Sequence, residues 1–319
     1  MQELIHNAYE SLKKGDADSA LGLLKNALEI DYEHPEVIYA LKCLNWWLEK
    51  LKRLEDLNDP YEQGGYILSQ WKLYFGFLDR IEESGHPDKT SLAYDSCQYA
   101  IKRFVFSRAL GYFLHILENG NQQDTELLLQ TGRCCKGAGD WEKALNYLEQ
   151  ASRLRREDSA ILSELADVNA LLGDERAAKV LFREAFFLDP QEIDLYSLES
   201  EMILALMEKV KAMGHTGPLA AEWIPVWGCI WGVFAIKREL KPVELSRLKQ
   251  NISSLENECR GHNGGGKSEQ EPFIKPRLLN RYFWLIDNCE YSRDTSGLID
   301  ETMLKIKVID QAVYEQYRS

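Results

Sequence analysis

The stretch GDWEKALNYLEQASRLRRED, residues 139–158, is followed by a second version of itself, GDERAAKVLFREAFFLDPQE, at residues 173–192. The two segments align without a gap, and both begin with Gly-Asp and carry alanine at the same two positions. A third version, GDADSALGLLKNALEIDYEH, lies at residues 15–34. A recurrence at a fixed spacing of 34 residues is typical of repeat architectures.

The shared positions have a physical meaning. Glycine accepts the left-handed conformation that closes one helix, and the aspartate after it caps the next helix. Alanine is expected where two helices approach most closely, and a larger apolar residue where successive pairs meet. The aligned positions are Gly15, Gly139 and Gly173; Ala20, Ala144 and Ala178; Leu24, Leu148 and Phe182; and Ala27, Ala151 and Ala185.

A unit of helix, turn and helix that recurs every 34 residues resembles the tetratricopeptide repeat family. The resemblance covers residues 1–34, 125–158 and 159–192, roughly a third of the chain, and the family's usual Trp and Tyr are missing from the aligned columns. The resemblance implies an all-α solenoid of helical hairpins that acts as a protein-interaction scaffold.

The remaining segments are also expected to be helical, with a looser pattern. We expect non-standard hairpins at residues 35–124 that continue the stack, and at 125–213 the two repeats plus a following helix. A divergent, Trp-rich helical cap is predicted at 214–260. A flexible Gly-rich linker at 261–275 and C-terminal helices at 276–319 complete the chain.

Composition narrows the possible functions. Of the 319 residues, 45% are hydrophobic and 28% are charged, a balance typical of globular proteins. The net charge of −13 disfavours binding to nucleic acid or to anionic membranes, and favours a basic or amphipathic protein partner. The apolar run at residues 223–236 is shorter than the roughly 20 residues that span a bilayer, so it predicts a buried helix and no transmembrane segment.

The cysteines and the N-terminal residues indicate the cellular compartment in which the protein is expected. The seven cysteines form no C-x-x-C and suit neither a disulfide framework nor a zinc site, so we expect small core residues and a reducing environment. Residues 1–14 are amphipathic and do not resemble a signal peptide. The expected location is therefore the cytoplasm.

Residues 261–268, GHNGGGKS, match the phosphate-loop pattern G-x-x-x-x-G-K-[ST]. A working loop of this kind connects a buried strand to a helix. Here the match follows the polar end of a predicted helix, and Pro272 and Pro276 oppose a helix that begins at Lys267. We therefore interpret it as a linker, with a nucleotide-binding regulator as a remote alternative.

Other chemistry is not indicated. The six histidines have no metal-site spacing, and no nucleophile motif such as G-x-S-x-G occurs. The sequence therefore predicts no enzyme, no cofactor and no metal site.

The resemblance implies that a partner lies along a concave wall formed by the first helix of each repeat. Where some family members hold a chaperone's C-terminal carboxylate, this chain offers only Arg133 as a suitable side chain, so capture of such a tail is not expected. Acidic residues in the wall favour a basic or amphipathic partner, unless they are merely a solvated face. The predicted partner-binding residues are Gln130, Arg133, Ser163, Glu164, Asp167, Asp194 and Ser197.

A second interaction surface is predicted at Trp223, Trp227 and Trp231. It belongs to the alternative function, in which the chain self-associates or acts as an assembly factor of a membrane complex through residues 223–236.

Overall fold

The computed structural model contains α-helices and no strand in the residues that it describes, which confirms the all-α prediction. These residues are 1–82, 92–120, 123–234, 237–261, 271–293 and 296–318. They divide into two compact units, Met1–Arg155 and Arg156–Ser319.

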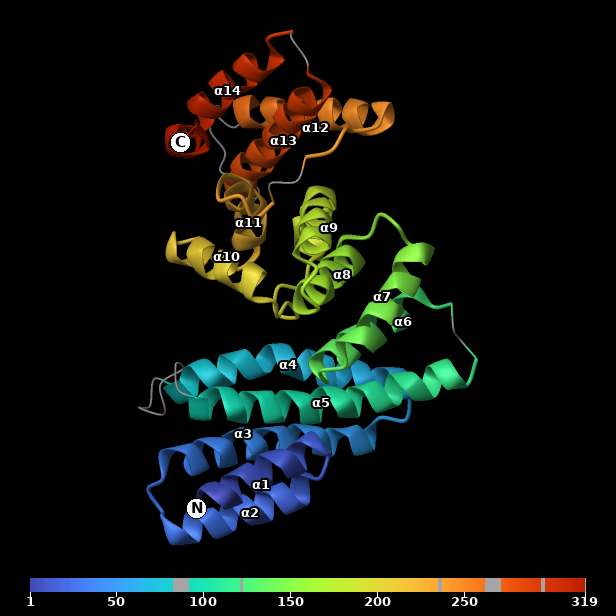
Figure 1. Ribbon diagram of the computed structural model, residues 1–319, viewed down its shortest axis with the longest axis vertical. Helices are drawn as coiled ribbons and strands as arrows, with labels where there is room; N and C mark the ends of the chain where they lie inside the picture. The colour runs from blue at the N-terminus through green and yellow to red at the C-terminus, as the bar shows by residue number, and fades with distance from the viewer. Residues whose placement is uncertain (83–91, 121–122, 235–236, 262–270, 294–295, 319) are drawn as a thin grey trace. The chain divides into compact units, whose positions relative to one another are not determined.

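The first unit consists of three hairpin-like pairs and a connecting helix (Figure 1). Helix α1 pairs with α2, α4 runs antiparallel to α5, and α6 pairs with α7, while α3 lies between α2 and α5. The bounds are α1 (Gln2–Lys13), α2 (Ala17–Ile30), α3 (Pro35–Leu51), η1 (Lys52–Asp56), α4 (Pro60–Glu82), α5 (Leu92–Glu118), α6 (Thr125–Gly137) and α7 (Trp141–Leu154).

The three hairpins predicted from the repeat share one turn. Gly15, Gly139 and Gly173 have φ angles of +87°, +82° and +88°, in the left-handed region that favours glycine. In each case the backbone N–H of the next residue, aspartate, donates to a carbonyl five residues earlier at 2.9 Å. The aspartate side chain then accepts a hydrogen bond from the backbone N–H three residues on, at 3.0 to 3.2 Å. The predicted Gly-Asp turns are confirmed.

Small residues lie where the paired helices meet. The alanines at both shared positions of all three hairpins are fully buried, as are Leu24, Leu148 and Phe182. In the α6/α7 pair, a Cβ added to Gly132 would lie 2.6 Å from Cγ of Leu148, much closer than atoms can approach. The side chains at these positions therefore set how closely the two helices pack.

The longer helices of the first unit enclose an aromatic core. Trp47 and Tyr74 are buried, and their ring centroids lie 5.4 Å apart. Trp71 contacts Phe106 of α5 edge to face, with ring centroids 5.0 Å apart. The aromatic run of α4 thus packs against its neighbours, as side chains at helical spacing usually do.

The second unit begins with the α8/α9 hairpin and is completed by helices that surround α13 (Figure 1). Helix α13 contacts α11, α12 and α14, and most of its residues from 278 to 289 are buried. The bounds are α8 (Ser159–Leu171), α9 (Glu175–Leu188), η2 (Pro190–Glu192), α10 (Glu201–Ala212), α11 (Pro218–Ile230), α12 (Pro242–Gly261), α13 (Glu271–Ser292), α14 (Leu298–Ile309) and α15 (Gln311–Arg318).

Two boundaries differ from the sequence expectation. The sequence predicts a helix directly after the second of the two adjacent repeats, from residue 193, but α10 starts only at Glu201. The sequence also places residues 271–275 in a linker, but they form the start of α13, since the first turn of a helix tolerates Pro272. Residues 262–270, which include Lys267 and most of the predicted phosphate loop, lie outside the described residues.

Two exposed glycines of the first hairpin allow a test of the repeated turn. Gly15 and Gly22 both have open space where a Cβ would lie, but only Gly15 has a positive φ angle. We expect Gly15→Ala to lower the free energy of unfolding by about 1–2 kcal/mol because alanine is strained in that conformation. Gly22→Ala, within α2, should raise it by roughly 0.5–1 kcal/mol. Urea denaturation measures both, and equal effects of the two substitutions would contradict the assigned turn.

Candidate functional site

Asp167 of α8 anchors the irregular segment that follows α9. Its two carboxylate oxygens accept hydrogen bonds from the backbone N–H groups of Glu199 and Ser200, each at 2.8 Å. The Asp167 side chain is fully buried, and Ser200 is the residue at which α10 is capped. The carboxylate thus satisfies backbone groups at a helix start and holds the irregular segment 193–200, which contains a turn at 195–197, against α8.

Glu164, one turn earlier on α8, is engaged with the same segment. It is fully buried and accepts a hydrogen bond from the hydroxyl of Ser197, and that hydroxyl also lies 2.7 Å from the carbonyl oxygen of Asp194. Ser163 is buried beside it, with its hydroxyl bonded to the carbonyl of Ala160. The structure therefore places five of the seven predicted groove residues on α8 and the segment that it holds, and the carboxylates of Glu164 and Asp167 bind the chain's own segment.

Gln130 and Arg133 of the predicted groove lie on α6 in the first unit. Both are half-buried, and Gln130 donates from Nε2 to Glu126 Oε1 at 2.6 Å. The partner-binding role assigned to all seven residues stays a prediction.

The three predicted tryptophans form a ladder along α11. The ring centroids of Trp223 and Trp227 lie 6.2 Å apart, and those of Trp227 and Trp231 lie 5.1 Å apart, with interplanar angles of 23°. Trp223 and Trp227 are buried, whereas Trp231 is half-buried with the Lys209 ammonium 5.3 Å from its ring centroid. The ladder is therefore mostly part of the core of the second unit. In the part of the chain that the structure describes, every helix is too short or too polar to serve as a membrane span.

His215 extends this ladder, since its ring lies parallel to that of Trp223 with centroids 4.4 Å apart. Burial lowers the pKa of the His215 imidazole from its usual 6.5, and the positive charge of Lys275 lowers it further, while Asp310 acts in the opposite direction. The neutral imidazole is therefore the form that the folded unit favours.

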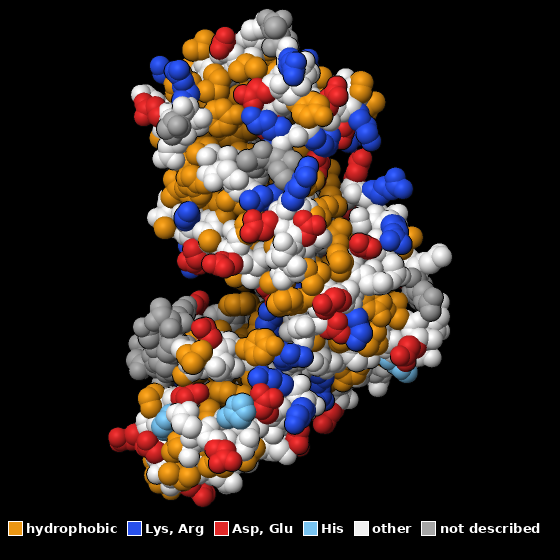
Figure 2. Space-filling view, in the orientation of Figure 1, with side chains coloured by type: hydrophobic (Ala, Val, Ile, Leu, Met, Phe, Trp, Pro, Cys, Tyr) orange, Lys and Arg blue, Asp and Glu red, His pale blue; other side chains and the backbone are white. Residues whose placement is uncertain are grey.

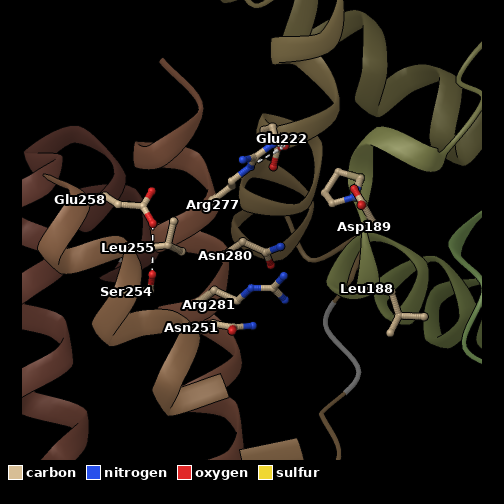
Figure 3. A pocket seen from close by; sticks show the side chains of 11 residues that line it. Leu188, Asp189, Glu222, Asn251, Ser254, Leu255, Glu258, Arg277, Asn280 and Arg281 are labelled. Atoms are coloured by element: carbon tan, nitrogen blue, oxygen red, sulfur yellow. Dashed lines mark hydrogen bonds and ion pairs between the residues drawn. The ribbon is translucent and has the colours of Figure 1, made fainter. Parts of the chain in front are cut away.

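A polar cavity of about 330 Å³ opens in the second unit between the end of α9, α11, α12 and α13 (Figure 3). Helix α13 contributes Arg277, Asn280 and Arg281, whose side chains point into the space that faces Leu188 and Asp189. The opposite wall comes from the polar face of α12 and includes Asn251, Ser254 and Glu258. The cavity thus combines two cations with several carboxylates and amides.

Arg277 is committed to an ion pair within the cavity. Its Nε donates to Glu222 Oε1 at 2.8 Å, and Nη2 lies 2.8 Å from the same oxygen. Glu222 is buried and also accepts a hydrogen bond from Gln191 Nε2 at 2.8 Å. A buried carboxylate requires such partners, so this pair is a fixed part of the wall.

Arg281 differs from Arg277 in its contacts, because neutral groups hold it. One of its N–H groups donates to the carbonyl of Phe187, and its guanidinium carbon lies 4.6 Å from the centroid of the Phe187 ring. No carboxylate of the described residues lies within ion-pair distance of it. Burial lowers the pKa of the Arg281 guanidinium from its usual 12.5. The negative charges of Glu222 and Asp189 act in the opposite direction, and the positive charge of Arg277 lowers the pKa further.

Asn280 presents an unused acceptor beside Arg281. Its side chain is 4% exposed, and Nδ2 donates to the carbonyl of Phe186 at 3.2 Å. Its Oδ1 is buried and forms no hydrogen bond with the described residues. The donor on Nδ2 fixes which way the amide faces, because Oδ1 could not take its place against a carbonyl oxygen.

None of the cavity's lining residues is among the site residues predicted from the sequence. A signal existed in KPRLLNRYFWL, residues 275–285, where Arg277, Asn280 and Arg281 share one face of a strongly apolar helix. Among the described residues, no group of three or more His, Cys, Asp or Glu side chains is placed to hold a metal ion.

The charges are not separated into patches on the face that Figure 2 shows. Acidic and basic side chains are interspersed over the helices of each unit. The excess of acidic residues in the chain, with its net charge of −13, is therefore not gathered into one region of that face.

Comparison of the sequence with family models and curated proteins identifies no relative. No protein-family model matches this chain, and a search of curated proteins finds no significant sequence match. The resemblance to tetratricopeptide repeats thus rests on the residue pattern described above.

The buried anchor on α8 makes a prediction about stability. Asp167→Ala leaves two backbone N–H groups without an acceptor, so we expect a loss of roughly 2–4 kcal/mol in the free energy of unfolding. Glu175→Ala on α9 is the control, because its carboxylate is largely exposed and should change stability by less than about 0.5 kcal/mol. Guanidinium denaturation followed by circular dichroism compares them, and a neutral Asp167→Ala would contradict the anchoring role.

The lowered pKa of His215 makes a prediction about pH. Since the folded pKa lies below the unfolded value, protonation favours the unfolded chain, and the contribution to stability is present above about pH 6.5 and lost as the pH falls below it. We expect the free energy of unfolding to decline less between pH 7 and pH 5 in His215→Gln than in the wild type. Urea titrations read by tryptophan fluorescence at each pH provide the measurement, and parallel pH profiles would refute the assignment.

Proposed function

We propose that the chain is a non-enzymatic scaffold of the tetratricopeptide type that binds another protein. The observation that supports this proposal is the recurrence of one hairpin, with the same glycine turn, aspartate cap and buried alanines, in α1/α2, α6/α7 and α8/α9. A single hairpin of this kind cannot bury its apolar face alone, and stacked copies expose an extended face of first helices.

That exposed face is the proposed binding surface for an extended or helical segment of the partner. On α6 the relevant side chains are Gln130 and Arg133, which are half-buried and therefore accessible in part. In the second unit, Glu164 and Asp167 act instead as supports for residues 193–200, so the surface there would be formed by Asp194 and Ser197.

The acidic character of the chain favours a basic partner. A net charge of −13 speeds encounter with basic segments and opposes nucleic acid. The seven cysteines are all free thiols, and Cys43, Cys97, Cys134, Cys135 and Cys289 are buried, which suits a reducing compartment such as the cytoplasm. The alternative, assembly through the Trp-rich segment, has less support because Trp223 and Trp227 are buried within their own unit.

Site-specific photo-crosslinking tests the proposed surface. A photoreactive phenylalanine replaces Gln130 on α6 or, as the control, Glu149 on the exposed side of α7. After expression in the native source, we expect a partner protein to be captured from position 130 and not from position 149, and the yield to fall as salt screens the charges. Excess wild-type protein should compete for the same partner. Equal capture from both positions, or none from position 130 while a partner co-purifies, would refute this surface.

A further inference from the structure

We propose that the cavity between α9, α11, α12 and α13 binds a carboxylate that carries a neighbouring hydrogen-bond donor. Arg281 would hold the carboxylate and Asn280 Oδ1 would accept from the donor. This site belongs to the second unit and does not depend on the scaffold proposal.

Arg281 forms no ion pair with the residues that the structure describes, and this points to an anionic ligand. Charges that a protein removes from water, even in part, are normally paired because the loss of hydration is costly, and Arg281 is half-buried. Arg183, in the same unit, has an ion pair with Asp287, and Arg277 has one with Glu222. Arg281 has only the Phe187 carbonyl and ring as partners among the described residues, and it points into the cavity (Figure 3). An anion in the cavity would complete its pairing, and a carboxylate matches the fork of N–H groups on a guanidinium.

The amide oxygen of Asn280, beside Arg281, points to a hydrogen-bond donor on the ligand. Asn280 Oδ1 is buried without a hydrogen bond and has a fixed orientation, as described above. Because an unsatisfied buried acceptor is unfavourable, the complementary ligand brings an N–H or O–H group to this position. Arg281 and Asn280 both line this one small cavity, so the ligand's donor must lie close to its carboxylate.

The other charges in the cavity exclude more highly charged ligands. Asp189, Glu222 and Glu258 line the same cavity, and Arg277 is already paired. These carboxylates would repel a phosphate dianion more strongly than a ligand with one negative charge, and one carboxylate matches the single charge of Arg281. The volume of about 330 Å³ lies at the lower end of ligand cavities, which suits a group of the size of an amino acid or a dipeptide.

Such a group has two possible sources, a free small molecule or an acidic segment of a partner protein. N-acetylglycine represents the first, because it has a carboxylate next to an amide N–H. The peptide acetyl-Gly-Asp-Gly-amide represents the second. Tighter binding of the free compound would indicate a small-molecule site, and tighter binding of the peptide would indicate a site for a protein segment.

Calorimetry on the full-length chain tests the proposal. We expect N-acetylglycine or the peptide to bind, and N-acetylglycine amide and inorganic phosphate to bind at least tenfold more weakly. Arg281→Gln should weaken binding at least about tenfold, because it removes the charge and the fork. The control Arg260→Gln, on an exposed part of α12, should leave binding unchanged. Equal binding to Arg281→Gln, preference for phosphate, or no binding by either carboxylate probe at millimolar concentration would overturn the proposal.

A second pair of variants keeps the test valid if Arg281→Gln fails to fold. Asn251 lines the cavity from α12 and is exposed, so substitutions there should not disturb the core. Asn251→Asp should weaken binding about threefold or more, and Asn251→Lys should strengthen it by a similar factor, since the two add opposite charges near the ligand. Unchanged affinity in both variants would likewise refute a carboxylate in this cavity.

Discussion

The close contact between the two helices of each hairpin is the constraint on which the repeated part of this structure depends. Alanine at two positions of each second helix, all six of them fully buried, leaves no side-chain volume between the helix backbones. At Gly132 the space is so limited that even a methyl group would overlap Leu148. Because interiors are packed to high density, this contact fixes the spacing of the pair, and the larger residues at Leu24, Leu148 and Phe182 can then fill the core.

The second unit relies on buried polar contacts as well as on apolar packing. Arg183 of α9 pairs with Asp287 of α13 and donates to the carbonyl of Phe234 at 2.7 Å, while its guanidinium lies 4.6 Å from the ring centroid of Trp284. These contacts tie the segment that follows α11 to the two helices of the core. Asp167 does the same for the segment that follows α9. Charged groups thus position irregular segments, in addition to the apolar residues by which these segments join the core, such as Leu198 and Phe234.

The two proposed activities follow from these two kinds of packing. The repeated hairpins would present a face of first helices to a partner, and their function requires only that the helices be rigid and correctly spaced. The cavity on α13 depends instead on a charged side chain that forms no ion pair with the residues that the structure describes. Arg183 and Arg277 are paired there, so Arg281, beside an amide oxygen that accepts no hydrogen bond from the same residues, is the feature that packing alone does not explain.

The sequence by itself determined the all-α class, the three repeated hairpins, their turns and their buried alanines, and the presence of further helices between residues 35 and 124. These features follow from local signals, since a glycine turn, an aspartate cap and an apolar period each act within a few residues. The tertiary structure alone decided that Glu164 and Asp167 are buried, that residues 193–200 are not helical, and that α13 forms one wall of a cavity. The bonds responsible join residues far apart in the chain, at separations of 33 for Ser197 and Glu164, 55 for Arg277 and Glu222, and 94 for Asn280 and Phe186. Which polar side chain meets which backbone group at such distances depends on how whole helices pack, and no pattern within a single helix contains that information.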